Sequence, residues 1–229
     1  MSRLMLYQFA IFGVEAIIVV LLLLVLLRLR SRFGLSPLYV TLGVFQPIQV
    51  LLASSLYAEI LPGLIVSPGS VVMFTASLLA VLLVYILEDA LETRKVIYGI
   101  ILANLTMTLL LYLFGLHLKL PSTLNFLELP LEIFQQNARV MFFGTIFLFA
   151  DVLLIIFVYE MICRKITKNH FLTIYLTIAI IIVFDSLGFY TGAFYGQENY
   201  RSILISGIIG KLGMALLFAA GASVYLRFF

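Results

Sequence analysis

The chain has 229 residues, of which 64% are hydrophobic and only 11% are charged, and its formal net charge is +3. Soluble domains are typically about 45–50% apolar and about 25% charged. The composition therefore excludes a disordered chain, a coiled coil and an ordinary soluble enzyme, and it indicates a protein that crosses a membrane several times. The basic excess fits loops at a lipid surface and gives no reason to expect a nucleic-acid partner.

Seven apolar runs follow one another along the chain, and each is long enough to cross the lipid hydrocarbon as a helix. The runs cover residues 8–27, 37–58, 66–87, 96–115, 138–162, 171–192 and 204–226. The first run is too long for a signal peptide and has no small-residue cleavage site, so we expect it to remain as a helix. The predicted fold class is an all-α polytopic membrane protein with seven transmembrane helices.

Basic residues in the connections predict the orientation, because cytoplasmic loops carry an excess of Lys and Arg. One set of connections carries Arg28, Arg30, Arg32, Arg94, Lys95, Arg164, Lys165, Lys168 and Arg227, whereas the other carries only Arg3, Lys119, Arg139 and Arg201. We therefore expect the N-terminus outside and the C-terminus inside. The expected location is the cell inner (plasma) membrane.

Turn-forming residues mark the predicted helix boundaries. Ser36 is expected to cap the second helix, with Pro37 at its first position. Leu61-Pro62-Gly63 is expected to end that helix, and Ser67-Pro68 to open the third. The one long connection, at about 116–137, is either a lid at the outer interface or a partly ordered loop.

Several ionisable residues lie inside the predicted spans, among them Glu15, Asp151, Asp185 and Lys211. Such residues cost roughly 2.5–3.5 kcal/mol at a helix centre and usually face the interior of the bundle. Asp185 and Lys211 fall at a similar depth on consecutive antiparallel helices, so we expect them to form an ion pair. Asp151 is expected near the same polar centre. The pair could serve ligand recognition or only hold the helices together.

Amide side chains add to this polar interior. Gln46 and Gln49 are three residues apart and share a helix face, and Asn104 and Thr108 are four apart near the middle of the fourth span. Together with the charged residues they could form a pocket for a planar polar ligand. Hydrogen bonding between helices is the alternative. Three tyrosines are expected to close the pocket from outside: Tyr57, Tyr190 and Tyr195.

Catalytic and cofactor motifs are missing from the sequence, which contains no GxSxG, HExxH, phosphate loop or CxxC. We therefore expect neither an enzyme nor a cofactor. His117 and His170 are too far apart in sequence to suggest a metal site. Lys211 in the last helix would suit a retinal protein, but the chain has no Trp, and its third span has no acid in its core.

The last three spans resemble the VUT family of queuosine-precursor (deazapurine) transporters. The resemblance is carried by Asp185-Ser186-Leu187-Gly188-Phe189, then Ala193-Phe194-Tyr195-Gly196, then Lys211, and by Asn137-Ala138-Arg139-Val140 earlier in the chain. It implies that Arg139, Asp185 and Lys211 are ligand-site or core-network positions. Ser186, next to Asp185 in the same motif, is counted among the candidate ligand-binding residues. The resemblance also implies a six-helix unit over residues 35–229, preceded by an additional helix and basic loop over residues 1–34.

Two further phrases make the chain look closer to VUT-like membrane modules joined to sensor histidine kinases: Phe33-Gly34-Leu35-Ser36-Pro37-Leu38-Tyr39 and Leu87-Glu88-Asp89-Ala90-Leu91-Glu92. The first hypothesis is therefore a small-molecule sensing module, the input domain of a signalling protein whose kinase domain could follow Phe229. The second is a transporter of a queuosine precursor or another purine-like nutrient. The expected partners are the lipid bilayer, a small polar or purine-like ligand and, for a kinase module, a second copy of the chain.

Overall fold

The computed structural model describes residues 3–126, 128, 130–131, 134, 138–196 and 200–228, and the side chains of 138–141 fall outside this description. In the described part, seven helices are long and apolar enough to cross a membrane. The predicted all-α, seven-span fold is confirmed. The elements in chain order are α1 (Arg3–Arg28), α2 (Arg30–Phe33), α3 (Ser36–Ser55), β1 (Ala58–Leu61), β2 (Leu64–Val66), η1 (Gly69–Met73), α4 (Phe74–Leu87), α5 (Ala90–Leu118), α6 (Ala138–Lys165), α7 (His170–Phe194) and α8 (Tyr200–Arg227).

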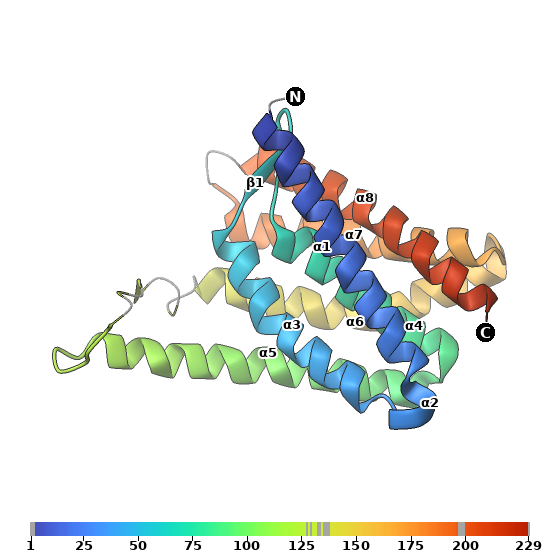
Figure 1. Cartoon of the computed structure of the whole chain (residues 1–229), viewed down its shortest axis with the longest axis horizontal. Coiled ribbons are helices and arrows are strands. Elements are labelled where there is room, and N and C mark those ends of the chain that lie inside the picture. The colour runs from blue at the N-terminus through green and yellow to red at the C-terminus, as the bar shows by residue number, and fades with distance from the viewer. Residues whose placement is uncertain are drawn as a thin grey trace.

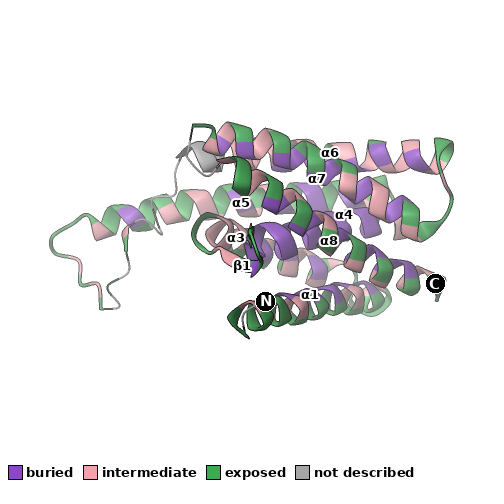
Figure 2. Cartoon of the chain, turned by 90° about the horizontal axis from the view of Figure 1, so that it is seen from above, coloured by how far each residue is buried: buried purple, intermediate pink, exposed green. Residues whose placement is uncertain are grey.

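The third span, η1 together with α4, forms the centre of the bundle. In the apolar 18-residue stretch of this span 78% of the residues are buried, compared with 22–44% in the corresponding stretches of the other spans. A helix that is hydrophobic on all sides is expected to be buried, because no face of it prefers a polar surface. Figure 2 shows this buried helix between α1 at one edge of the bundle and α6 at the opposite edge.

The chain alternates between two faces of the bundle. We call the face at the start of α1 and the end of α3 the N-terminal face, and the face at the end of α1 and the end of α8 the C-terminal face. In Figure 1 the hairpin and the end of α5 lie toward the left, whereas α2 and the C-terminus lie toward the right. The prediction that the N-terminal face is outside the cell stays a prediction.

An antiparallel β hairpin on the N-terminal face replaces the predicted end of the second span. The helix α3 stops at Ser55, and β1 pairs with β2 around a turn at Pro62-Gly63, where Gly63 has a φ of +76°. The prediction that Leu61-Pro62-Gly63 ends the helix is therefore wrong. The predicted cap is also wrong, because Ser36 is already inside α3 and no side chain caps its first turn.

The third span begins with a π-helical turn that lies directly against α3. A Cβ atom on Gly69 would overlap the carbonyl oxygen of Gln49 and the amide nitrogen of Ala53, so only glycine fits there. The hydroxyl of Ser67 donates to the carbonyl oxygen of Leu52 at 2.8 Å and fixes the same contact. A π turn points its side chains differently from an α-helix and is frequent at functional sites.

Helices α6 and α7 pack closely as an antiparallel pair. A Cβ atom on Gly188 would overlap the ring of Phe147, and one on Gly192 would overlap the ring of Phe143. The two contacts are four residues apart on each helix and run in opposite directions along the sequence, which defines the antiparallel register of α6 and α7. The predicted lid at 116–137 begins inside α5, and much of its remainder lies outside the described residues.

Candidate ligand-binding pocket

A pocket with both polar and apolar lining residues opens among six of the spans, in the half of the bundle nearer the N-terminal face. It contains about 670 Å³ of empty space, its open mouth included. The lining residues are Gln46, Gln49, Val50, Ala53, Ser70, Phe74, Asn104, Thr108, Gly144, Thr145, Leu148, Asp185, Phe189 and Lys211. Each helix that contributes does so from its middle or from its part nearer the N-terminal face.

Lys211 of α8 and Asp185 of α7 form a buried ion pair in the wall of the pocket. The Lys211 Nζ lies 2.7 Å from Asp185 Oδ2 and 3.2 Å from the hydroxyl of Ser186. The same ammonium lies 4.5 Å from the ring centre of Phe74 and 5.4 Å from that of Tyr190. Carboxylate, hydroxyl and two aromatic rings together offset the cost of removing the ammonium from water. The predicted ion pair is confirmed.

Two glutamines of α3 line the pocket, and three of their side-chain polar atoms have no hydrogen-bond partner among the described residues. Gln46 is 1% exposed, and neither its Oε1 nor its Nε2 has a partner among the described residues. The Oε1 atom of Gln49 is in the same situation. A buried polar atom without a partner costs about 1–3 kcal/mol. These amides are therefore able to bind a ligand that offers complementary donors and acceptors.

Asn104 uses part of its hydrogen-bonding capacity between helices. Its Nδ2 donates to Thr145 Oγ1 of α6 at 3.1 Å, and both residues line the pocket. The helix-contact role considered for Asn104 is thus observed together with its place in the pocket. Thr108, one turn further along α5, also lines the pocket.

Other predicted site residues lie outside the pocket wall. Ser186 reaches the pocket only through its hydrogen bond with Lys211. Asp151 is fully buried but does not line the pocket. The side chain of Arg139 is outside the described residues. The expectation that three tyrosines close the pocket is wrong, because none of them lines it: Tyr57, Tyr190 and Tyr195.

Several lining residues were missed by sequence reasoning: Ser70, Phe74, Thr145 and Phe189. Ser70 and Phe74 follow Pro68 by two and six residues, so the start of the third span was the available signal. Their direction depends on the π turn, however, which the sequence does not announce.

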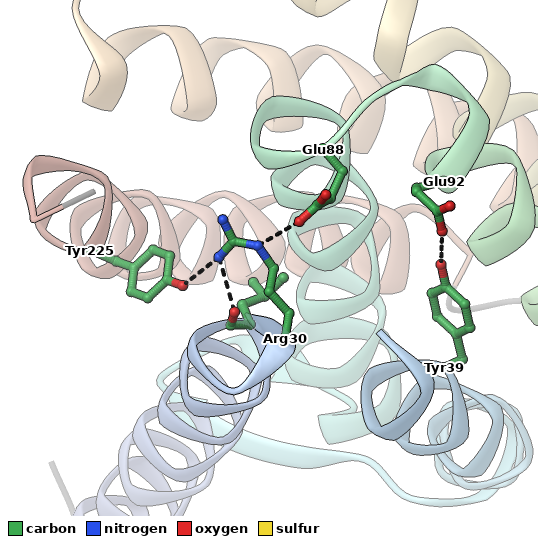
Figure 3. A network of polar contacts seen from close by, with 6 residues as sticks. Arg30, Tyr39, Glu88, Glu92 and Tyr225 are labelled. Carbon is green, nitrogen blue, oxygen red and sulfur yellow. Dashed lines mark hydrogen bonds and ion pairs between the residues drawn. The ribbon is translucent and has the colours of Figure 1, made fainter. Parts of the chain in front are cut away.

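A second polar cluster ties helix ends together at the C-terminal face (Figure 3). The residue Glu88 directly follows α4, and its Oε1 accepts a hydrogen bond from Nε of Arg30 in α2 at 2.5 Å. The Nη1 atom of Arg30 donates to the carbonyl oxygen of Leu27 at 3.0 Å and to the Tyr225 hydroxyl of α8 at 3.3 Å. We call Arg30, Glu88 and Tyr225 the arginine clasp. It joins the ends of α1, α4 and α8.

A neighbouring contact joins α3 and α5 at the same face. The hydroxyl of Tyr39 donates to Glu92 Oε2 at 2.9 Å, as Figure 3 shows. Glu92 also pairs with Lys95, one turn further along α5. From the sequence, the basic residues of this face were used only to predict the membrane orientation. The contacts of Arg30 show that it also joins helix ends at this face, and Lys95 pairs with the same Glu92 that binds Tyr39 of α3.

A family model described as vitamin uptake-like sensor matches residues 20–226. The match includes about the last third of α1 and every pocket residue. No curated protein and no solved structure matches the chain significantly. The resemblance to VUT-like sensing modules is confirmed, and the chain belongs to the vitamin uptake-like sensor family.

Proposed function

We propose that this chain is a membrane-embedded sensing module that binds a small polar ligand in the pocket and transmits its presence to the C-terminal face. The observation that carries the proposal concerns two glutamines that line the pocket beside the buried ion pair. Both polar atoms of the buried Gln46 amide and the Oε1 atom of Gln49 lack a hydrogen-bond partner among the described residues. A purely structural polar cluster would be expected to satisfy these atoms internally. Membership of a sensor family supports the same function.

The lining favours a flat ligand with hydrogen-bonding edges. A glutamine amide offers an acceptor oxygen and a donor nitrogen side by side, which complements one edge of a nucleobase-like ring. Phe74 and Phe189 provide aromatic surface for the faces of such a ring. Lys211 and Asp185 add one donor group and one acceptor group at another edge. The ligand class we propose is a small heteroaromatic compound with amide-like edges, of which purine-like nutrients are examples.

Two helices connect the pocket with the arginine clasp. α8 carries Lys211 in the pocket wall and Tyr225 in the clasp, about 21 Å apart at a rise of about 1.5 Å per residue. α4 carries Phe74 in the pocket wall and is followed directly by Glu88. A ligand changes the balance between two packing arrangements of these helices only if it binds them with different affinities. The free energy that couples two such sites is typically about 1–3 kcal/mol.

The wider setting follows from the same proposal. We infer that the module lies in the inner membrane with its C-terminal face in the cytoplasm, and that it is the input domain of a signalling protein such as a histidine kinase. The expected assembly is a homodimer. Reading the gene beyond Phe229 tests the fusion directly.

Transport of a queuosine precursor or another purine-like nutrient is the second candidate. It is favoured by two irregular helices at the pocket, since Pro47 lies inside α3 and the third span opens with the π turn η1. Interrupted helices at the substrate site recur in secondary transporters.

A binding and uptake experiment separates the two. We would measure binding of guanine, 7-deazaguanine and adenine to the protein in lipid nanodiscs, and uptake of the binding compound into proteoliposomes. The sensing proposal expects saturable binding that Gln46→Leu weakens at least tenfold, with no accumulation inside the vesicles. Binding unaffected by Gln46→Leu would contradict the pocket assignment, and accumulation in the vesicles would favour transport.

A further inference from the structure

Asp151 is a buried acid that the pocket does not use. It lies near the middle of α6 and is fully buried. Neither of its carboxylate oxygens has a hydrogen-bond partner among the residues that the structure describes. Acids at such depth in a membrane are rare and normally have a partner, so the lack of a donor calls for an explanation.

The register of α6 and α7 places Asp151 beside Asp185. Phe147 of α6 lies against Gly188 of α7. Asp151 follows Phe147 by four residues and Asp185 precedes Gly188 by three, so in an antiparallel pair both acids lie about one turn from this contact, in the same direction. Both side chains are buried at this helix contact, and their carboxyl groups interact electrostatically. The polar neighbour of Asp151 is therefore a second carboxyl group, already bound at Oδ2 by Lys211.

The charges of this cluster do not balance if both acids are ionised. Asp185 of α7 and Lys211 of α8 are the charged groups that interact with Asp151, and α4 and α5, which also pack against α6, contribute none in the described part of the chain. Two carboxylates and one ammonium would leave a net negative charge in the hydrocarbon layer. Two ionised carboxylates also cannot hydrogen-bond to each other, because both are only acceptors.

We propose that Asp151 and Asp185 hold one proton between them, forming a buried proton site next to the pocket. The Asp151 hydroxyl donates to Asp185, and Lys211 donates to the Oδ2 atom of the same carboxylate. The cluster is then neutral, and every carboxyl group in it takes part in a hydrogen bond. Because Asp185 and Lys211 also line the pocket, a ligand that displaces Lys211 would change how tightly the proton is held; this last step rests on the proposed function.

Infrared spectroscopy of the full chain in lipid nanodiscs at neutral pH tests the proton site without any ligand. A protonated carboxyl group gives a C=O band above the amide I region, and the band shifts in D2O. The expected result is a band that disappears in Asp151→Asn and persists in the matched control Glu15→Gln. Glu15 is the appropriate control, because it is another acid within a span and lies on the peripheral helix α1.

Three outcomes would overturn the proposal. The first is a wild-type spectrum without the band, and the second is a band that Glu15→Gln removes. The third is the absence of the band together with a thermal stability that rises with Na⁺ but not with K⁺, which would assign the site to a metal cation. If Asp151→Asn fails to fold, as judged by circular dichroism, Asp151→Glu takes its place: it keeps a carboxyl group and should shift the frequency of the band, and a band at the wild-type frequency in that variant would overturn the proposal.

Discussion

Lys211 and Asp185 lie 26 positions apart in sequence, yet their Nζ and Oδ2 atoms are 2.7 Å apart across the α7–α8 contact, and both side chains line the pocket. This arrangement combines a structural and a recognition role in one pair. The ion pair holds two helices together, while its open side faces the space where a ligand would bind. Removing one partner should therefore affect both stability and binding.

We predict that Lys211→Met strongly destabilises the protein, because it leaves the nearly fully buried Asp185 without its cation. Loss of one partner of a buried pair typically costs about 3–5 kcal/mol. The measurement is thermal unfolding in detergent followed by circular dichroism. The double variant Lys211→Met with Asp185→Asn should recover part of the loss, since it removes the charge left behind.

The exposed loop residue Lys168 provides the matched control. Lys168→Met should leave the unfolding temperature nearly unchanged, because an exposed charge gains little from its surroundings. A Lys211→Met protein as stable as the Lys168→Met protein would contradict the structural importance of the pair.

We predict opposite effects of Gln46→Leu on stability and on binding. The substitution removes two buried polar atoms that have no hydrogen-bond partner in the described part of the chain, so the ligand-free protein should gain about 1–3 kcal/mol in stability. Ligand affinity should fall at least tenfold, because the proposed donor and acceptor are lost. Thermal unfolding and binding titrations check the two effects, and Gln8→Leu on the exposed surface of α1 is the control. A destabilised Gln46→Leu protein would mean that the amide has a partner after all.

The spans and the buried ion pair were predictable from the sequence, because both follow from strong local costs. A run of apolar residues in lipid must satisfy its backbone hydrogen bonds as a helix, and a charge inside a span must find a partner. The depths of Asp185 and Lys211 on consecutive helices then left few arrangements. The shared face of Gln46 and Gln49 followed from helix periodicity alone.

The remaining features depend on contacts between distant segments. The β hairpin replaced the expected helix end at Leu61-Pro62-Gly63 because β2 packs on α8, which local turn signals do not reveal. Asp151 was expected in the pocket from its depth, but its direction around α6 places it behind the pocket wall. The arginine clasp joins residues 58 and 195 positions apart, so no sequence pattern marks it.

We predict that Gly69→Ala destabilises the protein and weakens ligand binding together. The added Cβ would overlap backbone atoms of Gln49 and Ala53, which side-chain rotation cannot relieve, so α3 must move away from η1. Overpacking of this kind costs about 1–3 kcal/mol. The same shift displaces Gln49 from the pocket wall.

The control is Gly99→Ala in α5, where no atom lies within 4 Å of the new Cβ. Alanine has a higher helix propensity than glycine, so this variant should be as stable as the wild type or more stable by up to about 1 kcal/mol. Equal unfolding temperatures for the two variants would argue against the close contact of η1 with α3.

We predict that Tyr225→Phe separates binding from transmission. The substitution removes the hydroxyl that accepts a hydrogen bond from Arg30 but leaves the pocket residues unchanged. Ligand affinity should therefore stay within about twofold of the wild-type value, whereas the interaction between α2 and α8 should weaken by about 0.5–1.5 kcal/mol. The measurement is pulsed electron paramagnetic resonance, which gives the distance distribution between two spin labels. The labels are placed at the exposed positions Ser31 and Val224 in a Cys163→Ser background.

The wild-type protein should give a narrow distance distribution between the two labels, and Tyr225→Phe should broaden it without any ligand. Tyr98→Phe, at an exposed tyrosine of α5, is the control and should leave the distribution narrow. An unchanged distribution in Tyr225→Phe would mean that the clasp does not position α8. Since the pocket and the clasp are joined through α8, transmission would then have to pass through α4 and Glu88 alone, and Glu88→Gln would be the variant that broadens the distribution.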